Sequence, residues 1–263
     1  MKNIKVRHTR HSDIPFLVDV EFDRYAVMYK DSPRPRRDLE ALFSKRLDIA
    51  GDWMWSVCLD GKPVGFLSAM PTNSSPDDFV SWEDCTNNGT LVGKYDPAGR
   101  NVYVVNLDVL RTATKINGQY MLMAQLGAKL IKTGKQFVYF ESRMPMFSDW
   151  VGNSKNVGIE RWDTMSKAEK LELATMYSEL KIMRGNKSYY YDRLLEFYGG
   201  SGFVFDKVIP GAFKDKESLD FGVVCRADNP LPKLLRWWPI EPIVAFMVSM
   251  LGSTPAILQK FIG

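Results

Sequence analysis

The sequence predicts a mixed α/β (α+β) fold, with a mostly antiparallel central sheet flanked by helices on both faces. Three observations support this. Segments with strand-like and helix-like spacing of apolar residues follow each other along the chain. Asp60-Gly61 lies between two apolar runs, which is a strong hairpin signal. A strand–helix–strand sequence over 101–141 indicates a right-handed parallel crossover. The 263 residues are enough to bury a substantial core.

The N-terminal third supplies the first strands and helices. Ser12 or Asp13 is suited to cap a helix, and Pro15 falls in its first turn, where proline is tolerated. Apolar residues recur at helical spacing after Asp38. The expected elements are a strand at 3–8, a helix from Ser12 or Asp13, a helix from near Asp38, and paired strands at 53–59 and 63–70.

The middle of the chain is expected to hold the centre of the sheet. Residues 71–100 are rich in Pro, Asn, Asp, Ser and Gly, so we expect a long irregular loop, which is typical of functional segments. Residues 101–110 form a run of branched side chains, as in buried strands. A helix over 115–133 and a strand over 136–141 follow.

The remaining elements enlarge the domain. Ser166 and Glu169 form a capping-box pattern at the start of a helix. The expected elements are an insertion at 143–187 with a helix over 166–183, a helix at 188–198, antiparallel strands at 203–209 and 218–226, and an apolar tail at 230–263. We therefore expect one domain over 1–229, with insertions at 71–100 and 143–187, followed by the tail.

The composition excludes several classes of function. With 35 Lys and Arg against 31 Asp and Glu, the net charge of +4 is too small to indicate nucleic acid. Only His8 and His11 are histidines, which argues against most metal sites and Ser-His-Asp triads, so no metal is expected. Cys58, Cys85 and Cys225 lie far apart, which favours a reducing cytoplasm. We find no signal-peptide pattern and no run of roughly 18 apolar residues.

Two short segments carry the predicted chemistry. The first is Lys115-Ile-Asn-Gly118-Gln-Tyr120, at the start of a helix that directly follows a buried strand. The free amides of a helix's first turn attract anions, and glycine lets an anion approach closely. The second is Tyr198-Gly-Gly-Ser-Gly202-Phe203, where a helix ends and a strand begins. A phenol is protonated at neutral pH and can donate to a leaving group. Taken alone, the segment favours Tyr198 as a core aromatic, and only together with the first segment and the element order does it favour the acid role.

With the element order, these segments resemble the GNAT superfamily of N-acetyltransferases, which has an Arg/Gln-x-x-Gly-x-Gly/Ala and a Tyr-x-x-x-Gly-Phe segment at these places. Lys115 and Tyr120 depart from the first pattern. The resemblance covers roughly 3–226 and implies an acyl-CoA donor between the strands 101–110 and 136–142. Tyr198 would be the general acid toward the coenzyme A thiolate. The residues implied in donor binding are Leu107, Val109, Lys115, Asn117, Gly118, Gln119, Tyr120 and Met121.

An amine acceptor must lose a proton before it attacks a thioester, and the histidine shortage directs the search for a base to carboxylates. Asp108 lies in the donor strand, where burial is costly unless the group is paired or functional, or it faces outward. Glu141 is a second candidate, which could instead pair with Arg143. Cys58 has no histidine beside it and is disfavoured as a nucleophile.

The sequence therefore predicts an N-acyltransferase that moves an acetyl or longer fatty acyl group from a coenzyme A or carrier-protein thioester to an amine on a small molecule or peptide. The alternative is a non-catalytic acyl-CoA or partner-binding module of the same fold, which Tyr120 favours. Apolar residues of the insertion either line an acyl tunnel or pack a small core. The tail at 230–263 suggests contact with a membrane surface, an acyl carrier or a second subunit, on an otherwise cytoplasmic protein.

Overall fold

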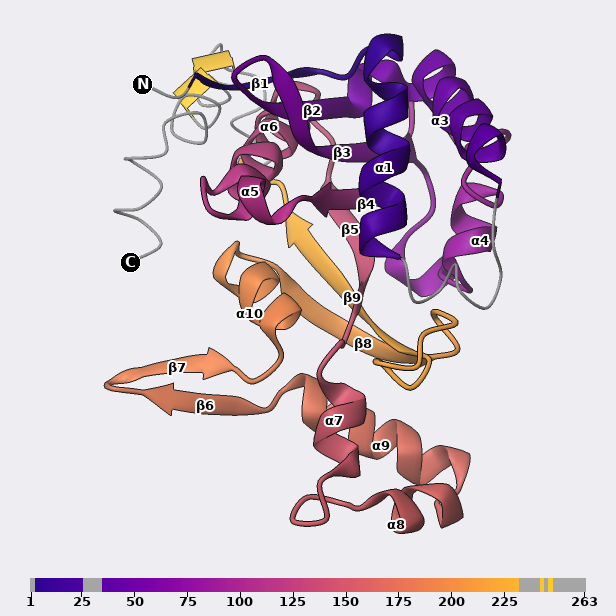
Figure 1. Ribbon diagram of the computed structural model, residues 1–263, viewed down its shortest axis with the longest axis vertical. Coiled ribbons are helices and arrows are strands. Elements are labelled where there is room, and N and C mark those ends of the chain that lie inside the picture. The colour runs from indigo at the N-terminus through magenta and orange to yellow at the C-terminus, as the bar shows by residue number, and fades with distance from the viewer. Residues whose placement is uncertain (1–2, 26–34, 232–241, 244–245, 248–263) are drawn as a thin grey trace. The chain divides into compact units, whose positions relative to one another are not determined.

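The computed structural model describes residues 3–25, 35–231, 242–243 and 246–247. Its strands form a seven-stranded sheet in the order β1-β2-β3-β4-β5-β9-β8 and a separate two-stranded sheet, β6-β7 (Figure 1). The chain divides into two compact units. The first unit consists of 1–75, 83–138 and 228–263, and the second of 76–82 and 139–227. We describe each unit separately.

The first unit contains an antiparallel run of four strands. They are β1 (Ile4–His8), β2 (Met54–Leu59), β3 (Lys62–Thr72) and β4 (Asn101–Val109). Asp60 and Gly61 join β2 to β3 with φ of 50° and 83°. Positive φ at both central residues is the turn that matches the twist of a hairpin. The predicted Asp-Gly hairpin is therefore confirmed.

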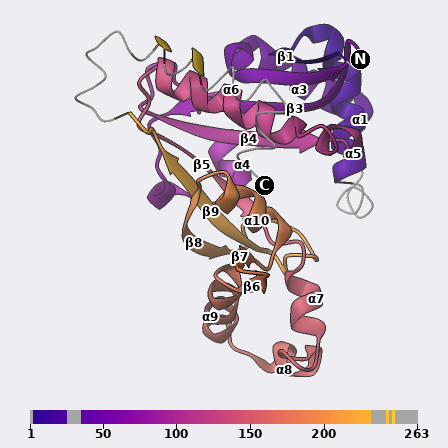
Figure 2. The same cartoon turned by 90° about the vertical axis from the view of Figure 1, so that its left-hand side faces the viewer.

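Helices cover both faces of these strands, as the sequence predicts (Figures 1 and 2). On one face α1 (Ile14–Arg24) and α3 (Arg36–Ala50) pack over Met54 and Phe66 in one apolar core. On the other face lies α6 (Gly118–Lys132), which approaches Val57 of β2. The helices of this unit thus bury most residues of β2, β3 and β4.

The segment 71–100, expected to be irregular, is mostly so but is closely tied to its surroundings. β3 continues to Thr72, and η3 (Pro76–Asp78) and α4 (Trp82–Thr86) are short helices. The amide of Asp96 donates to Pro71 O at 3.0 Å. A side chain at Gly99 would meet the Thr72 backbone at 2.5 Å, so only glycine allows this close return of the chain.

The second unit contains most of β5 and the elements after it. Strands β8 and β9 are antiparallel, as predicted. Its elements are β5 (Phe137–Arg143), α7 (Phe147–Gly152), α8 (Ile159–Thr164), α9 (Lys167–Ser178), β6 (Lys181–Arg184), β7 (Lys187–Tyr190), α10 (Arg193–Gly200), β8 (Val204–Pro210) and β9 (Phe221–Asp228).

Three predicted helix boundaries are wrong. The helix expected over 115–133 begins at Gly118, after a separate turn, α5 (Arg111–Thr114). The helix expected over 166–183 ends at Ser178, and the one expected over 188–198 begins at Arg193. Between them β6 and β7 form a hairpin around Gly185, which has φ of 62°. Gly185 in the turn and aromatic residues in β7 favour strands there.

The insertion packs a core of its own. Met144, Phe147 and Trp162, three of the apolar residues of the insertion, are buried together with residues of α9, α10 and β9. The Phe147 ring lies 4.8 Å from Tyr177 and 5.6 Å from Trp162. The second of the two alternatives, a small core, is therefore the one that the structure supports.

Other expectations concern membranes, metals and the tail. Within the described part of the chain, no helix is long and apolar enough to cross a membrane. The same residues contain no group of three or more His, Cys, Asp or Glu side chains placed to hold a metal ion. Most of the tail at 230–263 lies outside the described residues, so its predicted roles stay predictions.

Candidate functional site

Strand β4, the predicted donor strand, is irregular at its centre. Ser68 of β3 lies opposite Asn106, whereas the next residue, Ala69, lies opposite Val104. The register therefore shifts by one residue at Val105, which is the arrangement of a β-bulge. Bulges bend a strand and redirect its side chains and backbone groups. Leu107 and Val109, just beyond the bulge, are partly exposed.

Asp108 is buried rather than outward-facing, with an exposed fraction of 4%. The amide nitrogen of Asn106 donates to its Oδ2 at 3.1 Å. Nη1 of Arg46 donates to Oδ1 of Asn106 at 2.8 Å, and Nε of Arg46 donates to Gly89 O. A chain of hydrogen bonds thus links a carboxylate in β4 to a buried guanidinium in α3, and it compensates part of the cost of burying both charges.

A buried hydroxyl lies beside this chain of hydrogen bonds. Ser68 is fully buried, faces Asn106 across the strand pair, and its Oγ has no hydrogen-bond partner within the described part of the protein. Buried polar atoms are nearly always bonded to protein or water. The Ser68 hydroxyl and Asp108 together therefore provide polar groups that can bind a water or a polar substrate atom.

Sequence reasoning missed Arg46, which is only 1% exposed. A signal was present, since Arg46 falls on the same helical stripe as Leu39, Phe43 and Leu47. A charged residue on an apolar stripe is expected to have a specific buried partner.

The start of α6 is the predicted anion site. Asn117 precedes the helix in the left-handed conformation, with φ of 58°. Its carbonyl accepts from the amides of Tyr120 and Met121, at 3.1 and 3.2 Å, and its own amide donates to Thr114 O. Helix geometry leaves the amides of Gly118 and Gln119 without an acceptor in the same helix. These two amides are therefore the ones that the helix leaves available to an anion.

The motif suggests that a glycine at position 118 lets an anion approach, but the structure shows that it is needed for helix packing. A side chain there would lie 3.1 Å from Ala113 and 3.2 Å from Val57. Glycine therefore lets α6 pack closely on β2, whatever binds at the helix terminus. Lys115, two residues before Asn117, is exposed, while Gln119 and Tyr120 are partly buried.

In the second unit, Tyr198 lies in a cluster of aromatic rings. It is 9% exposed, and its ring centroid lies 4.6 Å from Phe140, 4.9 Å from Phe197 and 6.0 Å from Phe203. The Phe203 amide donates to Tyr198 O at 3.1 Å, and Gly202 has φ of 88°. The Tyr-x-x-x-Gly-Phe segment is thus a compact helix-to-strand turn that fixes the position of the tyrosine ring.

Asp192 anchors the helix that carries Tyr198. Its carboxylate accepts from the amides of Leu194 and Leu195 at the start of α10, from the Met146 amide at 3.1 Å, and from the Tyr177 hydroxyl at 3.2 Å. Burial raises the pKa of Asp192 against the effect of these donors. Burial, and the charge of Asp192, also raise the pKa of Tyr177.

Glu141 lies in β5, also in the second unit, and is half-buried. Arg143, the partner that the sequence suggested for it, donates to both carboxylate oxygens of Asp215 at 2.7 Å and to Glu217 at 2.7 Å. Burial, and then the charge of Glu141, raise the pKa of the Cys225 thiol.

The predicted residues therefore fall into two groups. The first unit holds the residues of β4, of α6 and of the turn before α6, which are Leu107, Asp108, Val109, Lys115, Asn117, Gly118, Gln119, Tyr120 and Met121. The second unit holds Glu141 and Tyr198.

Comparison with known proteins identifies the fold. No family model and no curated protein matches the sequence. Among solved structures, the chain is similar to the loading GNATL domain of CurA from Lyngbya majuscula, with 18% identity, a TM-score of 0.63, and coverage of 86% of this chain and 98% of that one. It is also similar to the GphF GNAT-like decarboxylase in complex with isobutyryl-CoA, with 18% identity, a TM-score of 0.54, and coverage of 86% and 99%. The chain therefore has the GNAT fold that its element order and motifs predict.

Proposed function

From the GNAT fold and the two groups of residues, we propose that this protein transfers a short acyl group from a coenzyme A thioester to an amine. The observation that carries the proposal is the start of α6, where two amides without an acceptor in their own helix and the exposed Lys115 follow the bulged strand β4 and the short helix α5. A carrier-protein thioester with the same pantetheine arm is the other donor source.

Donor binding would use backbone and charge together. The amides of Gly118 and Gln119 carry the partial positive charge of a helix N-terminus, and a pyrophosphate is the anion best matched to them. Lys115 would add a full charge on the solvent side. Leu107 and Val109, beyond the bulge, would offer backbone groups to the pantetheine arm. These residues fit the coenzyme without any metal.

The transfer is a direct attack of the amine on the thioester carbon. A neutral amine forms the new C–N bond while the C–S bond breaks. The amine proton passes to Asp108, directly or through a water beside the Ser68 hydroxyl, and Tyr198 gives its phenolic proton to the departing thiolate. Asn106, which Arg46 orients, donates to the Asp108 carboxylate and holds it in place. Glu141 is the alternative base.

The packing of the insertion indicates which length of acyl group the protein would transfer. Met144, Phe147 and Trp162 are buried in the core of the second unit, so they do not support a tunnel for a long chain. GphF, the comparison structure with a bound thioester, holds isobutyryl-CoA. Both observations favour a short acyl group over a fatty acyl group.

The donor assignment is tested by thermal shift with coenzyme A and acyl-CoAs of increasing chain length. A ligand that binds only the folded state raises the melting temperature. We expect the largest shift with two- to four-carbon chains. Lys115→Glu, which places a negative charge beside the pyrophosphate, should reduce the shift, while Lys45→Glu, at an exposed lysine on α3, should not. If no thioester changes the melting temperature, the donor proposal is wrong.

A second reaction has support from the comparison with GphF, a GNAT-like decarboxylase. A malonyl-type thioester can lose carbon dioxide at a polar site that stabilises the resulting enolate. Release of carbon dioxide from malonyl-CoA without any amine would favour this reaction, and amide formation from acetyl-CoA would favour N-acyl transfer. Binding without either product would indicate the non-catalytic module.

A further inference from the structure

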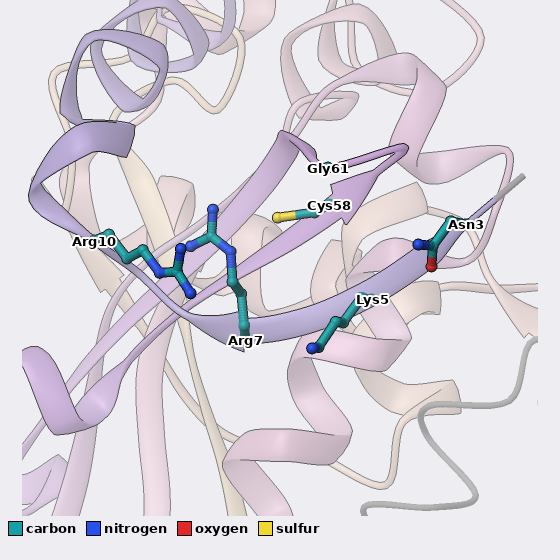
Figure 3. A pocket seen from close by; sticks show the side chains of 6 residues that line it. All are labelled: Asn3, Lys5, Arg7, Arg10, Cys58 and Gly61. Carbon is teal, nitrogen blue, oxygen red and sulfur yellow. The ribbon is translucent and has the colours of Figure 1, made fainter.

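The outer edge of the first unit's sheet carries a hollow that the proposed acyl transfer does not use. It has a volume of about 270 Å³ and is lined by Asn3, Lys5, Arg7, Arg10, Cys58 and Gly61 (Figure 3). Three of these six residues are cations, and they come from β1 and the turn that follows it. β1 is the last strand of the sheet, so the hollow lies at an open edge.

One of the cations is fixed by a carboxylate. Arg7 donates to both oxygens of Asp13, at 2.6 and 2.8 Å, and to His8 O at 3.0 Å. Asp13 is only 5% exposed. A bidentate pair of this kind fixes the plane of the guanidinium as well as its charge. Asp13 therefore orients Arg7 and balances one positive charge.

The other two cations are not balanced. Within the described part of the protein, neither the Lys5 ammonium nor the Arg10 guanidinium forms an ion pair or a hydrogen bond. Figure 3 shows the head groups of Arg7 and Arg10 converging near the Cys58 thiol. Like charges held this close repel each other, and an anion between them would remove the repulsion.

Cys58 adds no negative charge to the hollow. It is 3% exposed and lies opposite Lys5 in the β1–β2 pair. Burial raises the pKa of its thiol, although Arg7 opposes this effect, so the thiol is neutral at pH 7. The Asp60 carboxylate accepts from the amide of Asn3, at the other end of the hollow, at 2.8 Å. Counted from Lys5, Arg7, Arg10, Asp13 and Asp60, the hollow keeps an excess of about one positive charge near its lining.

We propose that this hollow binds a phosphate dianion, either free or as the phosphoryl group of a larger molecule. The excess positive charge attracts a phosphate, and guanidinium groups match its geometry. The volume is just below the range of sites for drug-sized ligands, so it suits the phosphoryl group rather than the rest of its carrier.

The hollow is separate from the proposed donor strand. β2 and β3 lie between β1 and β4, which places the two strands about 14 Å apart at the usual strand spacing. The start of α6 approaches Val57, which is next to Cys58 in β2 and points to the opposite face of the sheet. The hollow and the proposed pyrophosphate site therefore lie on opposite faces, and the anion proposed here is a second ligand.

The test is a titration of the full-length protein with inorganic phosphate at low ionic strength, followed by amide NMR and by melting temperature. The Gly61 amide should shift, and the melting temperature should rise more with phosphate than with acetate at equal ionic strength. Lys5→Gln combined with Arg10→Gln should weaken phosphate binding at least about tenfold. Arg7 is kept, because its pair with Asp13 supports the fold. The control Lys45→Gln should bind phosphate as the unchanged protein does.

Two further arms identify the source and separate the two proposals. Tighter binding of O-phosphoserine than of phosphate indicates a phosphorylated larger molecule, and the reverse indicates free phosphate. Lys115→Glu should weaken the coenzyme A response and keep the phosphate shift at Gly61, so either proposal can fail alone. An unmoved Gly61 amide, or equal affinity in the double variant, would overturn the phosphate site.

Discussion

Arg46 of α3 donates a hydrogen bond of 2.8 Å to Asn106 of β4, and Asn106 in turn donates one of 3.1 Å to Asp108. This connection places a permanent positive charge two side chains away from the proposed base. It also means that the orientation of the Asn106 amide is determined: its oxygen faces the guanidinium and its nitrogen faces the carboxylate. Asn106 therefore presents a hydrogen-bond donor, and not an acceptor, to the Asp108 carboxylate.

Replacing Arg46 should destabilise the protein. Arg46→Met keeps most of the volume but leaves Gly89 O and the Asn106 amide oxygen buried without a donor. The cost of a buried unsatisfied group is about 1–3 kcal/mol. We expect a loss of this size or more in urea unfolding. Arg37→Gln, at an arginine side chain that is 88% exposed, should change stability by less than about 0.5 kcal/mol. Equal losses of stability in the two variants would contradict a stabilising role for the hydrogen bonds of Arg46.

Tyr198→Phe should separate catalysis from packing. The phenylalanine ring keeps the contacts with Phe140 and Phe203, so the melting temperature should stay close to that of the unchanged protein. If the phenol protonates the thiolate, kcat should fall by about 100-fold or more while KM changes little. Steady-state kinetics with a thioester and an accepted amine measure this. A kcat near the unchanged value would remove Tyr198 from the acid role.

Local signals in the sequence predicted those parts of the fold that depend on neighbouring residues. Asp60-Gly61 predicted a hairpin because both residues tolerate positive φ, and they adopt it. Ser166 and Glu169 predicted a helix start, and each side chain bonds the other's amide, at 2.8 and 3.3 Å. Such signals need no knowledge of the tertiary structure.

Features that depend on distant residues were not predicted. The buried position of Arg46 requires Gly89 and Asn106, which are 43 and 60 residues away. The reason for Gly118 lies in Val57 on another strand. The hairpin at 181–190 has apolar residues that fit a helix as well as a strand, and short segments of this kind are ambiguous by spacing alone.

Gly118→Ala should destabilise the fold through packing. The new methyl group would lie 3.1 Å from Ala113 and 3.2 Å from Val57, so α6 must move away from β2. Overpacking of this kind costs about 1–3 kcal/mol. Gly152→Ala is a matched control, because nothing lies within 4 Å of the added atom. Thermal unfolding of both variants measures the difference. A Gly118→Ala protein as stable as the control would show that α6 does not pack tightly on β2.

The ion pair of Asp215 with Arg143 should make stability depend on pH in the acid range. Asp215 is 3% exposed; burial raises its pKa, but the bonds from Arg143 and Ser218 outweigh burial, and the pKa is lowered overall. A carboxyl whose pKa is lower in the folded state contributes stability above its unfolded pKa of about 3.9, and this contribution is lost as pH falls through the folded pKa. Melting temperature should therefore fall below about pH 4. Asp215→Asn should be less stable at pH 7 and lose less on acidification, whereas Glu160→Gln, at an exposed carboxylate, should follow the unchanged protein. Parallel curves for Asp215→Asn and the unchanged protein would assign the acid sensitivity to other groups.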